Sequence, residues 1–182
     1  MIELLQEAVK ELPYLLYQEG WKSLFVDYHK PYVFRLYRQW RDIYRLSLHQ
    51  ILPVDDASEC LFHPHPWPSA IMIVSGQYEQ AIGYRSAKDA CFENSHPSKI
   101  VRSILRPGSM YEMLTPDEWH YVRPIGLPSY SIMLSGPPFS KPDKKENQPV
   151  SRPLEKDEIQ MMFDFFRDEF QMADYLDYAS HF

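Results

Sequence analysis

Three histidines carry the clearest chemical signal in this sequence. His63 and His65 stand two residues apart in Cys60-Leu-Phe-His-Pro-His-Pro-Trp-Pro68, and His120 lies between Trp119 and Tyr121. Side chains two apart on an extended strand point to the same face, so the first two imidazoles can reach one metal ion. His120 can complete the set from another strand. Since neutral imidazole suits zinc, copper, iron and nickel, the pattern predicts a metal centre at His63, His65 and His120.

Short strands are predicted around these histidines. The apolar run 69–75 ends at Gly76 and a second run follows it, a pattern typical of a hairpin. Arg106-Pro-Gly108 is a turn signal, and residues 127–136 form a further strand candidate. The histidine pair and His120 therefore belong to a succession of short strands.

The order of these landmarks resembles the cupin superfamily, over roughly residues 44–138. Its first motif has two histidines one residue apart, then a glutamate and a glycine, and its second motif runs from Pro-Gly to a histidine. The chain is similar to a group of small bacterial and phage cupin-like proteins of unassigned activity. The shared landmarks are His63-Pro-His-Pro-Trp67, Gly76-Gln-Tyr78, Arg106-Pro-Gly108, His120 and Leu134-Ser-Gly-Pro137.

The sequence departs from the cupin pattern at the fourth ligand. The glutamate position holds Ser69 or Ala70, the internal glycine of the second motif is Asp117, and the later asparagine is Pro124. Three neutral imidazoles leave a divalent ion with its full positive charge. Such an ion is a stronger Lewis acid and favours an anionic ligand.

The resemblance implies a reaction class as well. Thiol dioxygenases of the cupin superfamily use three histidines on iron, so the chain is expected to hold one divalent transition metal, with Fe(II) favoured over Zn, Ni or Mn. The expected function is a mononuclear Fe(II) dioxygenase acting on a small anionic substrate. The alternative is a non-catalytic small-molecule-binding cupin module with a structural or vestigial metal site.

A substrate pocket is expected beside the metal, and some of its residues can be suggested. An arginine would clamp the substrate anion, although each candidate is more commonly a solvent-facing side chain. Glu79, Tyr111 and Glu112 are candidates for acid/base function, and Glu79 could replace the missing ligand. The pocket residues predicted are Trp67, Ser69, Arg106, Tyr111 and Trp119. The candidate arginines are Arg85, Arg102, Arg106 and Arg123.

The expected fold is all-β, a cupin-type jelly-roll β-barrel with added N-terminal and C-terminal α-helices. Apolar residues at helical spacing predict one helix over residues 2–12 and another over about 154–178. Residues 32–51 predict two strands, because Tyr, Phe, Val and Trp dominate there. The domain boundaries are 1–30 for the N-terminal helix and lead-in, 31–138 for the barrel, 139–153 for a Pro-rich linker, and 154–182 for the acidic amphipathic helix.

Composition restricts the partners. The 182 residues have a net charge of −6, and residues 155–182 hold eight acids and two bases. An acidic chain is a poor ligand for phosphate backbones, so a small-molecule ligand is expected and nucleic acid is not. No apolar run approaches a membrane span and the N-terminus does not read as a signal peptide, so a cytoplasmic protein without a membrane partner is expected. A homodimer through the C-terminal helix is left open.

Several other residues have an ordinary interpretation. The basic and aromatic run from Tyr28 to Arg45 could bind a nucleic-acid strand by stacking, but an edge strand of the barrel with long basic side chains is favoured. Cys60 and Cys91 are expected to be reduced thiols. The remaining histidines, expected to be solvated or singly hydrogen-bonded, are His29, His49, His96 and His181.

Overall fold

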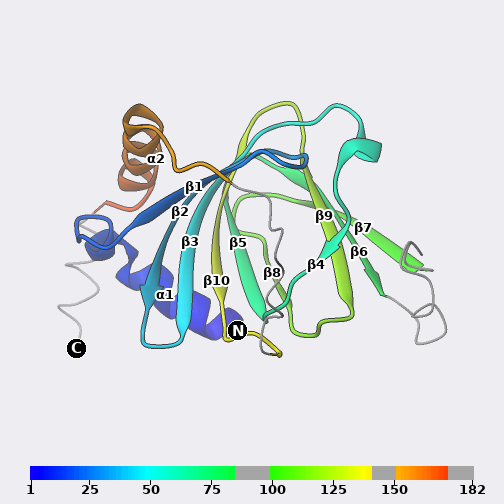
Figure 1. The fold of residues 1–182 in the computed structure, drawn as a ribbon, viewed down its shortest axis with the longest axis horizontal. Coiled ribbons are helices and arrows are strands. Elements are labelled where there is room, and N and C mark those ends of the chain that lie inside the picture. Colours follow the sequence, from blue (N-terminus) through cyan, green and yellow to red (C-terminus); the bar gives the residue numbers. More distant parts are fainter. Residues whose placement is uncertain (85–98, 141–150, 172–182) are drawn as a thin grey trace.

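The computed structural model describes residues 1–84, 99–140 and 151–171, and within them it has ten strands in two antiparallel sheets, two α-helices and one short 3₁₀ helix (Figure 1). A mainly β fold with a helix near each end is therefore confirmed. In chain order the elements are α1 (Ile2–Leu15), β1 (Lys22–Val26), β2 (Val33–Trp40), β3 (Tyr44–Ile51), η1 (Ala57–Glu59), β4 (His63–Pro64), β5 (Ser69–Ser75), β6 (Tyr78–Tyr84), β7 (Lys99–Leu105), β8 (Met110–Met113), β9 (Glu118–Pro124), β10 (Ser129–Ser135) and α2 (Lys156–Glu169).

The strands divide into a six-stranded and a four-stranded sheet. The larger sheet has the order β1-β2-β3-β10-β5-β8, and the smaller has the order β4-β9-β6-β7. Within the described residues no strand of one sheet pairs with a strand of the other. The closed barrel that we expected is therefore not formed, and the sheets face each other across an open-sided interior.

The run 69–75 and the run after Gly76 do not form the predicted hairpin. β5 pairs with β10 and β8, whereas β6 pairs with β7 and β9 in the other sheet. Gly76 has φ +73°, and a Cβ there would lie 2.7 Å from the carbonyl oxygen of Pro128. Only glycine fits this conformation and this close approach. Gly76 thus lies where the chain passes from one sheet to the other.

Two features of the larger sheet differ from expectation. β1 belongs to the sheet although it lies within the segment 1–30 that we assigned to the lead-in. The two strands predicted in residues 32–51 are confirmed as β2 and β3, but β2 lies between β1 and β3 and is not an edge strand. Its arginines therefore extend from both faces of an interior strand.

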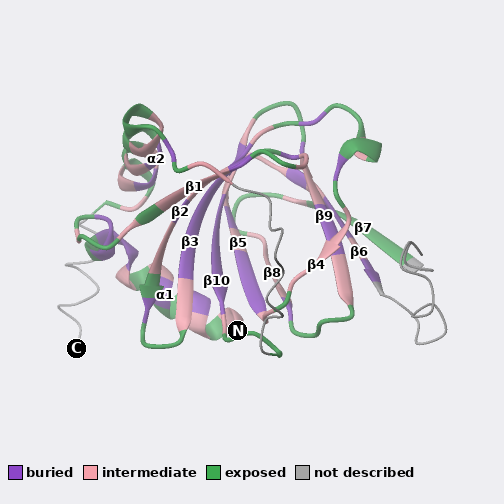
Figure 2. Ribbon diagram, viewed as in Figure 1, coloured by how far each residue is buried: buried purple, intermediate pink, exposed green. Residues whose placement is uncertain are grey.

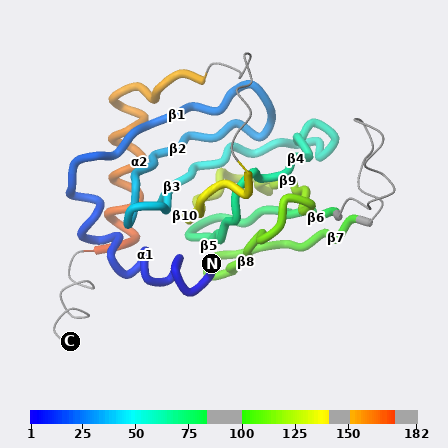
Figure 3. The backbone as a smooth tube through the Cα atoms, turned by 60° about the horizontal axis from the view of Figure 1, so that its bottom comes forward, coloured from blue at the N-terminus to red at the C-terminus, as the bar shows by residue number. Residues whose placement is uncertain are grey.

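Both helices pack on the outer face of the six-stranded sheet. α1 packs against β10, β5 and β8, and α2 packs against β2; Figures 1 and 3 show both helices on the side of this sheet away from β6 and β7. α1 runs to Leu15, past Pro13 where the sequence predicted its end. The buried core between helices and sheet includes Leu5, Leu12, Leu36, Leu48, Ile132, Leu134, Met162 and Phe166. Figure 2 shows its contribution from the sheet as purple strand segments.

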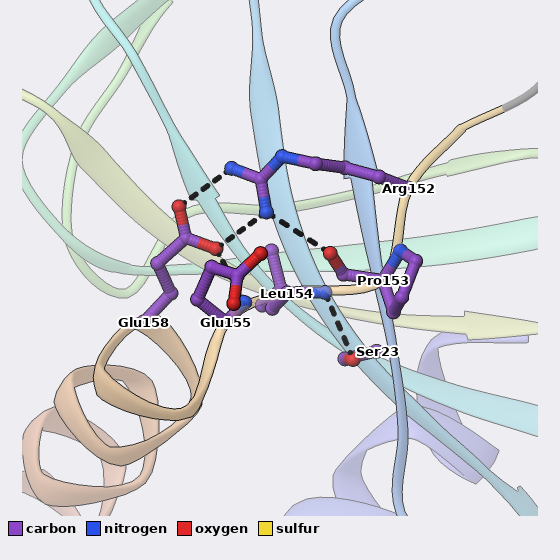
Figure 4. Close-up of polar contacts among 6 residues, drawn as sticks. All are labelled: Ser23, Arg152, Pro153, Leu154, Glu155 and Glu158. Atoms are coloured by element: carbon purple, nitrogen blue, oxygen red, sulfur yellow. Dashed lines mark hydrogen bonds and ion pairs between the residues drawn. The ribbon is translucent and has the colours of Figure 1, made fainter.

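The start of α2 is tied to β1 by polar contacts. Arg152 donates two hydrogen bonds of 2.7 Å to the carboxylate of Glu158, and the backbone nitrogen of Leu154 donates to Ser23 Oγ at 3.1 Å (Figure 4). The Arg152 guanidinium also lies 4.5 Å from the ring centre of Phe25. α2 ends at Glu169, and the rest of the predicted helix, residues 172–178, falls outside the described residues. Neither helix in the described part of the chain is long and apolar enough to cross a bilayer.

Candidate metal centre and adjoining cavity

The three predicted histidines meet at one edge of the smaller sheet. His63 and His120 are direct partners in the antiparallel pair of β4 and β9, and His65 follows β4 by one residue. β4 is only two residues long because the prolines at 64, 66 and 68 have no backbone N–H to donate. The segment after β10 supports this stretch, since the backbone N–H of Gly136 donates to the carbonyl of Pro68 at 2.8 Å.

The imidazole nitrogens are close enough to share one ion. One nitrogen from each of His63, His65 and His120 can be chosen so that all three lie within 4.8 Å of one another. The Nε2 atoms of His65 and His120 are 2.7 Å apart. Imidazoles bind zinc at about 2.0–2.1 Å, so two of them on one ion have nitrogens roughly 3.0–3.4 Å apart. Small side-chain movements would bring the three nitrogens into this range.

Two further observations fit a metal at this point. Nδ1 of His63 lies 3.0 Å from the carbonyl oxygen of Leu61, which can only accept, so Nδ1 carries the proton and Nε2 keeps its lone pair. Nδ1 of His120 is buried and has no hydrogen-bond partner. The donor set therefore contains a ligand whose tautomer is fixed and another whose buried ring is only partly satisfied by protein groups.

The protonation state also suits metal binding. Burial lowers the pKa of His63 and lowers the pKa of His120 well below its ordinary value of 6.5, and neighbouring imidazoles add to the effect. Burial, with the nearby His63 and Arg35, lowers the pKa of His65 to about 3. All three rings are thus neutral near pH 7, the form in which imidazole binds metals.

A cavity of about 200 Å³ adjoins the three histidines and lies between the two sheets. No aspartate or glutamate of the described residues lines it. Its size is below the range of about 300–1,000 Å³ common for drug-sized ligands, which indicates a smaller molecule. The apolar part of its wall consists of Val26, Val33, Ile51, Ile71, Val122 and Met133.

The structure places two of the five predicted pocket residues in this wall. Trp67 and Tyr111 line the cavity. Ser69, Arg106 and Trp119 do not: Ser69 is fully buried at the start of β5, and Arg106 is exposed in the turn before β8. Trp119 alternates with His120 along β9, so its side chain leaves the opposite face of the sheet.

Three of the four arginines proposed for an anion clamp, Arg102, Arg106 and Arg123, are also outside the cavity wall. Arg102 and Arg123 contact a network on the outer face of the smaller sheet, in which the hydroxyl of Tyr121 donates to Glu79 at 2.7 Å. Arg85 lies outside the described residues.

The two glutamate candidates bind other groups. The carboxylate of Glu79 is engaged by Tyr121 and Arg123, and that of Glu112 accepts from the backbone nitrogen of Ile2 at 3.2 Å. Since neither residue lines the cavity, Glu79 does not replace the missing cupin ligand and neither glutamate is placed for acid/base function there.

Sequence reasoning missed the polar residues that the larger sheet contributes. Arg35, His49 and Ser131 all line the cavity, from β2, β3 and β10. His49 is buried and its Nε2 accepts a hydrogen bond from Arg35 Nε at 2.9 Å, so it is singly bonded and not solvated. The available signal was the alternation Val33-x-Arg35-x-Tyr37 on a strand whose other face is mainly apolar. His29 lines the cavity too, while His96 and His181 lie outside the described residues.

Comparisons with known proteins assign no family. No protein family model matches the chain, and no curated protein matches it. Among solved structures, hydroxypropylphosphonic acid epoxidase from S. wedmorenis has a TM-score of 0.44 and 10% identity, over 62% of this chain and 55% of that chain. KdgF from Halomonas sp. has a TM-score of 0.43 and 14% identity, over 62% and 86%. Drosophila melanogaster CENP-C bound to CAL1 has a TM-score of 0.46 and 12% identity, over 74% and 98%.

These three likenesses are to an epoxidase, to KdgF and to a complex of two proteins, and at such TM-scores they assign neither family nor activity. The chain spans about half the length of the epoxidase chains that it matches.

Proposed function

We propose that this chain is a cupin-type protein that binds one divalent transition metal at His63, His65 and His120 and a small molecule in the adjoining cavity. The observation that carries the proposal is the convergence of three neutral imidazoles, within 4.8 Å of one another, at the wall of a cavity of about 200 Å³. Three protein ligands leave coordination positions open, as catalytic metal sites do.

The reaction that we favour is dioxygenation of a small anionic substrate with Fe(II). A bound Fe(II) ion would supply Lewis acidity and open coordination positions. The chain itself would hold the substrate against the apolar wall and exclude water from it. Because no carboxylate in the described part of the chain lines the cavity, the centre keeps the charge of a three-histidine site, which favours an anion as the exogenous ligand.

The alternative is a binding module in which the metal is structural and the cavity only holds its ligand. Its support is that the described cavity wall holds no carboxylate for acid/base function and that its tyrosines are not placed for it: the hydroxyls of Tyr78 and Tyr111 bond to each other, and burial raises the pKa of Tyr78 well above its ordinary value. Oxygen uptake separates the two functions. An iron-loaded protein that consumes oxygen with a small thiol or carboxylate supports the enzyme, and one that binds such a compound without uptake supports the module.

Metal content tests the proposal directly. We expect purified or reconstituted protein to hold close to one metal ion per chain by elemental analysis. His120→Ala should reduce this to below about a tenth while the protein stays folded, because losing one of three ligands removes much of the binding free energy. His29→Ala is the matched control, since His29 lines the same cavity but is not part of the three-histidine group. Wild-type metal content in His120→Ala would overturn the assignment.

A further inference from the structure

A row of polar side chains crosses the inner face of the six-stranded sheet. Arg35 on β2 is the direct partner of His49 on β3, and His49 is in turn the direct partner of Ser131 on β10. All three side chains line the cavity. Because residues paired across strands stand at the same level of a sheet, three successive strands present their polar groups side by side. Apolar residues on either side of this row, such as Val33 and Met133, complete the wall.

The guanidinium of Arg35 has no anionic partner in the described part of the protein. None of the ion pairs there involves Arg35, and no acidic residue lines the cavity. Burial, with the charge of Arg45, lowers the pKa of Arg35 to about 10, so it remains positively charged near pH 7. An uncompensated charge inside a protein is costly unless a ligand supplies the opposite charge.

The hydrogen bond that Arg35 makes leaves the rest of its guanidinium available to a ligand. Its Nε donates to Nε2 of His49 at 2.9 Å, which places the proton of neutral His49 on Nδ1 and fixes the plane of the guanidinium. Neither Nη atom of Arg35 has a hydrogen-bond partner among the described residues. Two adjacent N–H groups of this kind match the two oxygens of a carboxylate. The hydroxyl of Ser131, buried and without a partner, is a further donor at the same level.

We propose that Arg35, positioned by His49, is the subsite that binds the carboxylate group of a small molecule whose apolar body lies against the wall formed by Val33, Ile51 and Met133. A carboxylate fits better than a phosphate because the two Nη groups of one planar guanidinium match the two oxygens and the single negative charge of a carboxylate. Arg35 lines the same cavity as His63 and His65, so one small molecule in it can contact both sites. This subsite deepens the proposed function. It rests on that proposal only for the metal that would meet the other end of the ligand.

The experiment measures binding of sodium butyrate and sodium hexanoate, with butyramide as the neutral analogue, by calorimetry and thermal shift. Both carboxylates should bind to the wild-type protein and raise its melting temperature, and butyramide should not. Arg35→Met should weaken carboxylate binding at least about 10-fold, since bonds to a charged group are lost. Arg106→Met is the matched control, because Arg106 is exposed and outside the cavity wall, and its binding should equal that of wild type.

Stability without ligand provides a second readout. If Arg35 serves the ligand, ligand-free Arg35→Met should stay folded and lose no more stability than the missing hydrogen bond to His49 explains, because an unpaired charge is removed at the same time. Unfolding of the ligand-free variant would overturn the inference. Arg35→Lys keeps the charge but loses the planar pair of donors, so it should bind butyrate more weakly than wild type. Equal binding by Arg35→Lys or Arg35→Met would likewise overturn it.

The same titrations on chelator-treated and zinc-loaded protein separate this inference from the metal proposal. Carboxylate binding that depends on Arg35 in a protein that takes up no metal would leave the subsite standing and remove the metal centre. A protein that takes up metal through His120 but binds butyrate independently of Arg35 would remove the subsite alone.

Discussion

The hydroxyl of Tyr78 donates a hydrogen bond of 3.1 Å to the hydroxyl of Tyr111, and this contact joins the two sheets, because Tyr78 lies on β6 and Tyr111 on β8. Both residues line the cavity, and burial raises the pKa of each hydroxyl well above its ordinary value of 10. The pair is therefore neutral at every pH at which the protein is expected to fold.

Removing both hydroxyls of this pair should cost less than the two single removals added together. Tyr111→Phe leaves the buried Tyr78 hydroxyl without an acceptor, which we expect to lower the free energy of unfolding by about 1–3 kcal/mol. Adding Tyr78→Phe removes the unsatisfied group, so the double variant should be less destabilised than the sum of the single variants. Urea denaturation of all four proteins measures this difference, and simple additivity would show that the hydroxyls do not interact.

Helix α2 is expected to be a structural element, and two adjacent methionines test this. The side chain of Met162 is fully buried against the core, whereas Met161 is 42% exposed. Met162→Ala should lower the free energy of unfolding by about 2–5 kcal/mol, because it leaves a cavity. Met161→Ala should change it by no more than about 0.5 kcal/mol. Equal effects in chemical denaturation would show that α2 does not pack as described.

Two glycines with similar backbone angles should respond differently to alanine. Gly76 and Gly108 have φ of +73° and +84°, but only at Gly76 would a Cβ meet other atoms, the carbonyl oxygen of Pro128 among them. Gly108→Ala should cost about 1–2 kcal/mol from backbone strain alone. Gly76→Ala should cost clearly more, since the crossing between the sheets must also move. Thermal denaturation of both variants would reveal the difference, and a Gly76→Ala protein as stable as Gly108→Ala would contradict it.

The buried His49 should make stability depend on pH. Burial, with the charge of Arg35, lowers its pKa well below 6.5 in the folded protein. The unfolded chain therefore binds a proton in a range where the folded protein does not, and stability is full above about pH 6.5 and falls as the pH decreases below it. His49→Gln keeps an acceptor for Arg35 but does not titrate. Its stability should fall less between about pH 6.5 and pH 5, by up to about 1.4 kcal/mol per pH unit.

Chelator-treated protein should be used for this comparison, so that metal affinity does not enter. The same slope of melting temperature against pH in both proteins would show that His49 is not protonated on unfolding.

The sequence predicted the elements near the histidines better than their arrangement. The spacing of His63 and His65 and the strand around His120 were readable, because side-chain direction in a strand follows from its period of two. The sheet to which each strand belongs was not readable from the sequence. The apolar runs on both sides of Gly76 look the same whether they pair with each other or with distant strands. That choice depends on contacts between segments far apart in the chain.

The role of Arg35 was hidden for a related reason. Basic residues at 35, 38, 41 and 45 suggested an edge strand of the barrel. Only the position of β2 inside the sheet shows that its alternate side chains face the helices on one side and the cavity on the other. Arg38 bonds to the carbonyl of Leu15 on the helix side, while Arg35 enters the cavity. Single-sequence patterns do not reveal on which face of a strand a long charged side chain is buried.

The chain crosses at Gly76 from the sheet that carries Arg35 to the sheet that carries the three imidazoles. Arg35 belongs to one sheet and the three imidazoles belong to the other, so each sheet can keep its own internal hydrogen bonds while the separation between them changes.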